Sequence, residues 1–183
     1  MKKLLELEPR MKIFQHILKS PGVYFRELQK SLNMATGQLE HHLKYLEKSD
    51  VIVSIVEEGH RRFFASSKVT FEERKILPLL RQKVPRKILL FLLQKPYSRH
   101  VEICKALEKS GSTITKALRK LINKELVVTS GKDKAKEYRV IDEEKILRLF
   151  ILYRASYSNR ALSSFLADLE EGVRRAIEIL ETK

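Results

Sequence analysis

Apolar residues recur at helical spacing within residues 34–48. Leu39, Leu43 and Leu46 are separated by steps of four and three, which places them on one face of a helix. The other face carries hydrogen-bonding or charged side chains, namely Thr36, Gln38, Glu40, His41, Lys44, Tyr45 and Lys48. The first of these, Thr36, is suited to cap the helix by accepting a backbone N–H. The pattern therefore predicts an amphipathic helix over 36–48.

Two amphipathic segments precede this helix, and two β-rich segments follow it. Helices are predicted from Pro9 to about Ser20, ending at a Pro-Gly pair, and from Tyr24 to Leu32. Residues 51–56 are rich in β-branched side chains, and residues 61–65 return after a turn, which predicts a β-hairpin. Three helices followed by a hairpin, with a short turn between the last two helices, form a winged helix-turn-helix.

The same pattern returns 75 residues later without a gap. The shift pairs apolar core positions with one another, as in Ile13 with Ile88, Leu28 with Ile103, Leu39 with Ile114, Leu43 with Leu118 and Leu46 with Leu121. Few surface residues agree, so a repeat of the fold is better supported than a recent duplication. The second copy is predicted to have helices over 85–95, 99–109 and 112–124, and strands over 126–130 and 137–141.

A connector joins the two copies, and a tail follows them. In the connector, Thr70 and Glu73 form a capping box for a short helix, which Pro78 should kink or restart. The predicted fold class is mainly α with small β-hairpins. The predicted domains are a first winged unit over 1–66, a connector over 67–83, a second winged unit over 84–141 and a C-terminal helical segment over 142–183.

The tail has the features of an assembly segment. Asp142 is suited to cap a helix whose inward residues are Ile146, Leu149, Phe150 and Tyr153. From Asn159, apolar residues recur about every 3.5 positions, as in a coiled coil. Because this seam is too short to be stable alone, another surface must cover it. We expect a homodimer through the C-terminal segment, with packing on the chain's own domains as the alternative.

The charge is distributed unevenly along the 183 residues. There are 37 Lys and Arg against 23 Asp and Glu, a net of +14 with a pI near 9.9. Residues 67–141 carry a net of +12, against +3 for residues 1–66 and −1 for residues 142–183. This excess indicates an anionic partner, with nucleic acid ahead of an anionic membrane, and places the phosphate contacts mainly on the second copy.

The expected compartment follows from two further features. No apolar run approaches the roughly 18 residues of a membrane span, so we expect no membrane association. The single cysteine, Cys104, excludes an intramolecular disulfide and fits a reducing cytoplasm. Without a paired thiol it is expected to be inert.

Candidate DNA contacts in the second copy lie on the outer face of its third helix and in its wing. They are Ser112, Thr113, Thr115, Lys116, Arg119, Lys120, Asn123, Lys132, Lys134 and Lys136. Arg119 and Asn123 can pair bidentately with guanine and adenine edges, and a hydroxyl near a helix N-terminus suits phosphate. A solvated polar face is the competing interpretation, which the basic wing weakens.

Candidate contacts in the first copy are Thr36, Gln38, His41, Lys44, Tyr45, Lys48, Arg61 and Arg62. Glu40 would repel phosphate unless it accepts from a cytosine amino group, and Glu57 and Glu58 dilute the charge of the wing. His42 lies beside the inward stripe and is expected to pack against the wing. We therefore expect the first helix to discriminate between sequences and the second copy to anchor the protein.

The sequence has no pattern typical of catalysis or metal binding. The histidines at 16, 41, 42, 60 and 100 have no metal-site spacing, and neighbours on a helix point apart. A phosphate-binding loop and a nucleophile with its base are both missing. We expect neither enzyme activity nor a metal ion nor a cofactor.

Two stretches of the first copy carry a family resemblance. Pro21-Gly22-Val23-Tyr24-Phe25-Arg26-Glu27-Leu28 and Met34-Ala35-Thr36-Gly37-Gln38-Leu39-Glu40-His41-His42-Leu43-Lys44-Tyr45-Leu46-Glu47 resemble archaeal winged-helix transcriptional regulators. The two-copy layout with a helical tail is similar to archaeal regulators that carry two tandem winged helix-turn-helix domains. The second copy matches mainly at the level of pattern. The resemblance implies binding to promoter DNA and, for some such regulators, recruitment of basal transcription factors.

The sequence thus favours a sequence-specific, double-stranded DNA-binding transcriptional regulator. Its recognition helices, over 36–48 and 112–124, are expected in the major groove, with the wings on the backbone. One alternative is a protein-interaction module of a transcription or chromosome-organising complex, although such relatives are generally acidic. The other is a nonspecific chromatin or nucleic-acid binder, which the lysine-rich wing would suit.

Overall fold

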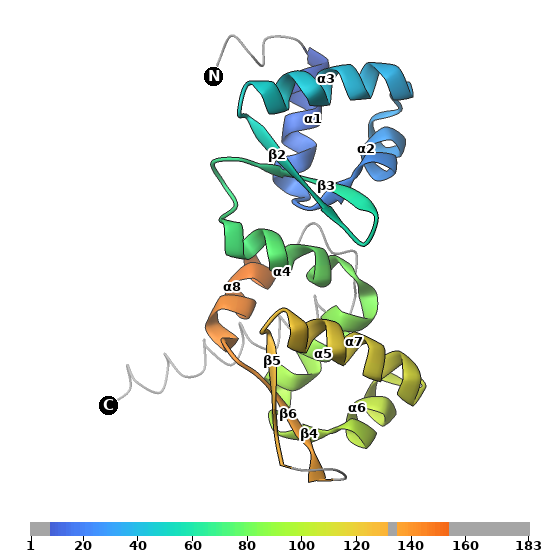
Figure 1. Ribbon diagram of the computed structural model, residues 1–183, viewed down its shortest axis with the longest axis vertical. Helices are drawn as coiled ribbons and strands as arrows, with labels where there is room; N and C mark the ends of the chain where they lie inside the picture. Colours follow the sequence, from blue (N-terminus) through green and yellow to red (C-terminus); the bar gives the residue numbers. More distant parts are fainter. Residues whose placement is uncertain (1–7, 132–134, 154–183) are drawn as a thin grey trace, which may run out of the picture. The chain divides into compact units, whose positions relative to one another are not determined.

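A computed structural model describes residues 8–131 and 135–153 (Figure 1). Backbone contacts divide the chain into two compact units, Met1–Gln82 and Lys83–Lys183. Both units are mainly helical with a small antiparallel sheet, which confirms the predicted fold class. No helix in the described residues is long and apolar enough to cross a bilayer.

The first unit has three helices, a small sheet and a further helix. In chain order the elements are α1 (Glu8–Lys19), β1 (Val23–Tyr24), α2 (Phe25–Leu32), α3 (Thr36–Lys48), β2 (Ile52–Glu57), β3 (His60–Ala65) and α4 (Phe71–Arg81). The strand order is β1-β3-β2. The predicted stripe of α3 is fully buried and packs with Ile13, Ile17 and Leu28 in one core. Each Leu so buried contributes about 1.5–3 kcal/mol relative to full exposure.

The second unit repeats this arrangement, including the helix that follows the sheet. Its elements are α5 (Lys83–Gln94), β4 (Ser98–Arg99), α6 (His100–Leu107), α7 (Gly111–Asn123), β5 (Val127–Ser130), β6 (Glu137–Val140) and α8 (Glu143–Leu152). Val23 pairs with Phe63 in the first sheet, and Ser98 pairs with Tyr138 in the second, each residue 75 positions on. The gapless repeat is therefore confirmed down to the strand register.

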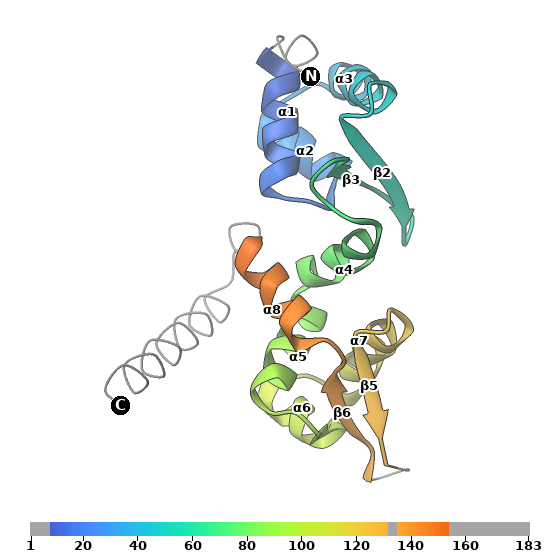
Figure 2. The same cartoon turned by 90° about the vertical axis from the view of Figure 1, so that its left-hand side faces the viewer.

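In each unit, the third helix and the β-hairpin lie on one side, and the first helix lies on the other (Figure 2). This is the winged helix-turn-helix arrangement that the sequence predicts. The short strands β1 and β4 were not predicted. Two residues are too few to show a period, and each strand exists because it pairs with the returning strand of the hairpin.

Left-handed backbone positions also repeat at this interval. Asn33 and Glu108 end the second helices with φ of 50° and 52°. Gly22 has a φ of 79°, and its counterpart Tyr97 has a φ of 61°. A side chain at position 22 would also meet the ring of Phe64, at 3.3 Å from the added carbon. The first copy thus has glycine where the second holds a tyrosine in a conformation that glycine favours.

Several predicted helix ends need correction. Thr36 is not the cap of α3, because the N-cap position is Ala35 and no side chain bonds there. Instead, the Thr36 hydroxyl accepts from Gln29 Nε2 at 2.8 Å. The helix α4 runs through Pro78 to Arg81, so it does not restart at the proline.

Other predicted caps are confirmed. Thr70 and Glu73 form the reciprocal capping box of α4. Asp142 accepts from the Lys145 N–H at 2.9 Å, and the inward residues Ile146, Leu149 and Phe150 are buried. Tyr153 follows α8 as its half-buried C-cap. The predicted seam from Asn159 lies outside the described residues.

Candidate nucleic-acid interface

The outer face of α3 is open to solvent as the sequence predicts. The exposed candidates are Thr36, Gln38, His41, Lys44 and Lys48. Tyr45 is half-buried, because the guanidinium of Arg10 on α1 lies 3.5 Å from its ring centroid. This stacking holds the ring against the body of the unit and leaves the lysines as the more accessible groups.

His42 on α3 is buried beside the leucine stripe. Burial lowers its pKa below the ordinary histidine value, and the charges of Arg10 and His41 act in the same direction. Its Nδ1 atom has no hydrogen-bond partner in the described part of the chain. His42 is therefore neutral near pH 7 and does not belong to the exposed face, whereas its predicted packing against the wing stays a prediction.

The outer face of α7 is also open. Ser112, Thr115, Lys116, Arg119 and Asn123 are exposed, and Thr113 and Lys120 are half-buried. The helix begins at Gly111, one residue before the predicted start, and its cap is Ser110. The Ser110 hydroxyl accepts from the Thr113 N–H at 3.4 Å, which the sequence reasoning missed.

A side chain from the preceding helix contacts each recognition helix. Gln29 of α2 donates to Thr36, and in the second copy His100 Nε2 lies 3.0 Å from Thr115 Oγ1. Cys104 Sγ lies 3.6 Å from the other ring nitrogen of His100. These contacts restrict the rotamers of two hydroxyls that are candidates for DNA contact.

The wing of the first unit is tied to its recognition helix. Arg61 donates to Glu47 Oε2 at 2.5 Å and to Ser54 Oγ at 2.9 Å. Ser54 in turn donates to Glu47 Oε1 at 2.6 Å. We call these three residues the Glu47 bridge. It occupies two of the nitrogens through which Arg61 could contact a phosphate.

Arg62 lies inside the unit although it was a candidate contact. It is 6% exposed and donates from Nη1 to the carbonyl of Gly22 at 3.1 Å. Burial lowers its pKa, and the carboxylate of Glu57 opposes that shift. The side chain stays charged because arginine is so strongly basic, but its position suits a structural role better than a phosphate contact.

The wing of the second unit differs at the equivalent positions. The counterparts of Glu47, Ser54 and Arg61 are Ile122, Thr129 and Lys136, so the carboxylate is replaced by an apolar side chain. Lys136 is exposed. The other two wing candidates, Lys132 and Lys134, lie outside the described residues.

No cluster of three or more His, Cys, Asp or Glu side chains suited to a metal ion occurs in the part of the chain that the structure describes.

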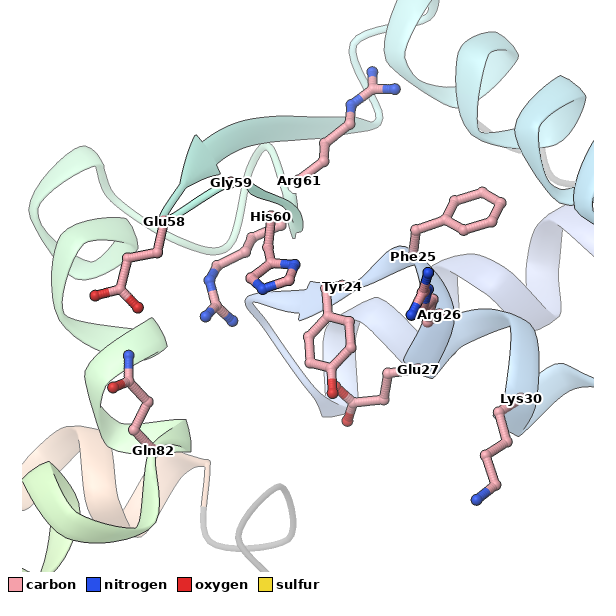
Figure 3. A pocket seen from close by; sticks show the side chains of 11 residues that line it. Tyr24, Phe25, Arg26, Glu27, Lys30, Glu58, Gly59, His60, Arg61 and Gln82 are labelled. Atoms are coloured by element: carbon pink, nitrogen blue, oxygen red, sulfur yellow. The ribbon is translucent and has the colours of Figure 1, made fainter.

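The first unit has an open cleft between the start of α2 and the turn that joins β2 to β3 (Figure 3). Its volume is about 950 Å³, and its walls combine aromatic and charged side chains. No sequence pattern predicted this cleft.

Two regions of this chain match known families, and they meet near the boundary between the two units. Residues 7–77 match a family described as an N-terminal HTH domain, and residues 81–128 match a family described as winged helix-turn-helix DNA-binding. The chain is 30% identical, over 146 residues, to an uncharacterized HTH-type transcriptional regulator of Methanocaldococcus jannaschii. The match covers 80% of this chain but only 36% of that relative.

Two similar solved structures are those of proteins from Lactococcus lactis and Corynebacterium diphtheriae. A mutant of ZitR from Lactococcus lactis is 16% identical, covering 81% of this chain and 97% of its own, with a TM-score of 0.36. The DIP2311 protein of Corynebacterium diphtheriae is 14% identical, covering 73% of this chain and 26% of its own, with a TM-score of 0.31.

Proposed function

Because this chain carries two tandem helix-turn-helix domains and is similar to an archaeal HTH-type transcriptional regulator, we propose that it is a sequence-specific, double-stranded DNA-binding transcriptional regulator. The helices α3 and α7 would enter the major groove, and basic side chains of the second wing would contact the backbone. DNA is read by side chains on base edges and held by contacts to phosphate.

The observation that carries this proposal is the same division of faces in both recognition helices. Leu43 on α3 and Leu118 on α7 are at most 2% exposed, whereas Lys44 and Arg119, next to them in sequence, are exposed. A helix fixed by its leucines and open on its polar side can present that side to a groove. Arg119 has the geometry to pair bidentately with guanine.

The two copies would contribute differently to binding. Residues 83–141 of the second unit hold 15 basic and 5 acidic side chains, a net of +10, so the second copy would supply most of the phosphate contacts. In the first copy, Arg61 is held in the Glu47 bridge, and Arg62 is buried inside the unit. The first helix would therefore act mainly in sequence discrimination, through His41 and Lys44.

Selection from a random pool of duplex DNA tests this function. We expect one sequence motif to be enriched, and its affinity to fall with salt by about 0.9 in log–log slope for each neutralised phosphate. Retention without enrichment would instead indicate a nonspecific nucleic-acid binder. Failure to retain DNA, together with capture of proteins from extract after nuclease treatment, would favour the protein-interaction alternative.

We also propose that the chain forms a homodimer through its C-terminal segment. The helix α8 ends with Ile151 and Leu152 exposed at 46% and 61%, and the apolar repeat of the tail follows in sequence from Asn159. Sedimentation of the full chain should give a dimer, and a chain that ends at Tyr153 should sediment as a monomer. A dimer would favour a palindromic or repeated motif. If both the full chain and the shortened chain sediment as monomers, dimerisation by the tail is excluded.

A further inference from the structure

The cleft of the first unit has the size and lining of a small-molecule site. Its volume of about 950 Å³ falls within the range of ligand pockets, roughly 300–1,000 Å³. The rings of Tyr24 and His60 lie side by side at its edge, with centroids 5.8 Å apart (Figure 3). Phe25, on the first turn of α2, also lines it. Aromatic groups from two elements thus provide surfaces on which a planar ring can stack.

The charged residues of the cleft favour an anion. Arg26, Lys30, Arg61 and Arg62 line it, against the two carboxylates of Glu27 and Glu58. Glu27 is already paired with Arg81 of α4, and likewise Arg61 is paired with Glu47 and Arg62 with Glu57. The cationic character of the cleft therefore rests on Arg26 and Lys30. Arg26 and Lys30 are exposed and one helical turn apart, so their charges lie on the same face of α2.

One cation of the cleft wall, Arg62, is enclosed by the protein. Arg62 lines the cleft although it is 6% exposed, and its Nε has no hydrogen-bond partner in the described part of the chain. Arg62 forms an ion pair with Glu57, whose Oε2 atom lies 3.7 Å from that nitrogen. A rigid duplex is too wide to enter a cleft that such a side chain closes, whereas a small molecule with a carboxylate or phosphate can enter it and pair with the exposed Arg26 and Lys30.

We propose that this cleft binds a small organic anion that carries an aromatic ring, such as an aromatic carboxylate or a mononucleotide. The anionic group pairs with the exposed cations Arg26 and Lys30, and the ring stacks on Tyr24 and His60. Charge-assisted hydrogen bonds from guanidinium groups are the strongest contacts that such a ligand can make here.

The cleft is connected to the recognition helix through one side chain. Arg61 lines the cleft and also donates to Glu47 on α3 in the Glu47 bridge. In Figure 3 the Arg61 side chain points away from Tyr24 and His60, but His60 is its neighbour in the chain. A ring stacked on His60 shifts the turn that carries Arg61 and so changes how the wing is held against α3. Occupancy therefore alters DNA affinity, a step of the inference that rests on the proposed function.

Titration calorimetry on the full chain without DNA tests the site itself. Indole-3-acetate and adenosine monophosphate serve as the two ring-bearing anions, with tryptophol and adenosine as their neutral counterparts and inorganic phosphate as an anion without a ring. We expect at least one ring-bearing anion to bind about tenfold or more tightly than its neutral counterpart and than phosphate. No binding by either anion, or equal binding of the neutral compounds or of phosphate, overturns the proposal.

A pair of surface variants locates the binding. Arg26→Gln removes a cation of the cleft, and Lys12→Gln removes an exposed cation on α1, outside the cleft. We expect the first change to weaken binding of the anion about fivefold or more and the second to leave it unchanged. Equal effects of the two variants would mean that the anion binds elsewhere.

The link to DNA is measured separately. With the selected duplex, a saturating anion should change the dissociation constant about fivefold or more, and Arg26→Gln should reduce that change. An unchanged DNA affinity with the anion bound overturns the effector role. If the chain binds no DNA, the proposed function fails, and the titrations without DNA still decide whether the cleft is a ligand site.

Discussion

The two winged units share one backbone pattern and differ in how the wing is held. In the first unit, Glu47 of α3 bonds both Ser54 and Arg61 of the hairpin. In the second, the same positions hold Ile122, Thr129 and Lys136, which cannot form this bridge. In the first wing, Arg61 is therefore bonded within the unit, whereas in the second wing Lys136 is exposed to solvent. A fold repeated at constant register can therefore supply two different functions by exchanging side chains at the helix–hairpin contact.

The largest expected effect comes from removing a proposed anchor. Arg119→Ala should weaken binding to every duplex by about 1.5–3 kcal/mol, because a charge-assisted contact of its guanidinium to phosphate is lost. Its counterpart on α3, Lys44→Ala, should mainly alter which sequences are preferred. Affinities of both variants for the selected motif and for unrelated duplex DNA provide the measurement. If Lys44→Ala weakened all sequences and Arg119→Ala only changed preference, the roles of the two copies would be reversed.

Weakening the Glu47 bridge in the first unit, or building a similar ion pair in the second unit, should change the salt dependence of DNA binding. Glu47→Gln weakens the bridge and makes Arg61 available to phosphate, so the log–log salt slope should steepen by up to about 0.9. Ile122→Glu places a carboxylate where it can pair with Lys136, so the slope should become shallower by a similar amount. Both variants are measured by titration of the same duplex at several salt concentrations. Slopes equal to that of the unchanged chain would mean that neither wing side chain contacts phosphate.

The sequence predicted the parts of the fold that depend on period and on short-range signals. Helical spacing of leucines located α3 and α7, and the 75-residue shift located the second copy. Both the resemblance to archaeal regulators with two tandem helix-turn-helix domains and the two-unit fold are confirmed. The Thr70 capping box was predictable because both partners lie three residues apart.

What the sequence did not predict depends on contacts between distant elements. Arg61 and Glu47 are 14 residues apart on different elements, and no periodicity links them. Arg62 was taken for an exposed cation because arginines are rarely buried, yet it donates to a carbonyl 40 residues away. The cleft has lining residues from α2, the hairpin and Gln82, so it exists only after those segments pack. Such features need the assembled chain.

Gly22 and its counterpart Tyr97 share a left-handed backbone conformation, so substitutions at the two positions should have unequal effects on the stability of the chain. Gly22→Ala should destabilise the first unit by about 1–2 kcal/mol, because the φ of 79° is left-handed and the new carbon would crowd Phe64. Tyr97→Gly relieves the same backbone strain at a φ of 61° but adds freedom to the unfolded chain, so it should change stability by at most about 1 kcal/mol. Chemical denaturation of each variant measures the difference. A larger loss for Tyr97→Gly would show that the exposed tyrosine ring contributes packing that outweighs the strain.

The smallest expected difference between the two units concerns how their stability depends on pH. His42 on α3 is matched by Ala117 on α7, so only the first recognition helix has a buried imidazole. Burial lowers the pKa of His42 in the folded state below its ordinary value of 6.5. The unfolded chain therefore takes up the proton first, and stability falls as the pH drops through 6.5 until the folded pKa is passed. Burial also lowers the pKa of His16, so His16 contributes to the loss of stability in the same direction.

Thermal unfolding between about pH 7.5 and 5.5 tests this. The variant His42→Gln should lose less stability on acidification than the unchanged chain, but it should still lose some. Parallel pH curves for the variant and the unchanged chain would show that His42 is hydrated in solution, and its burial would then not distinguish the two units.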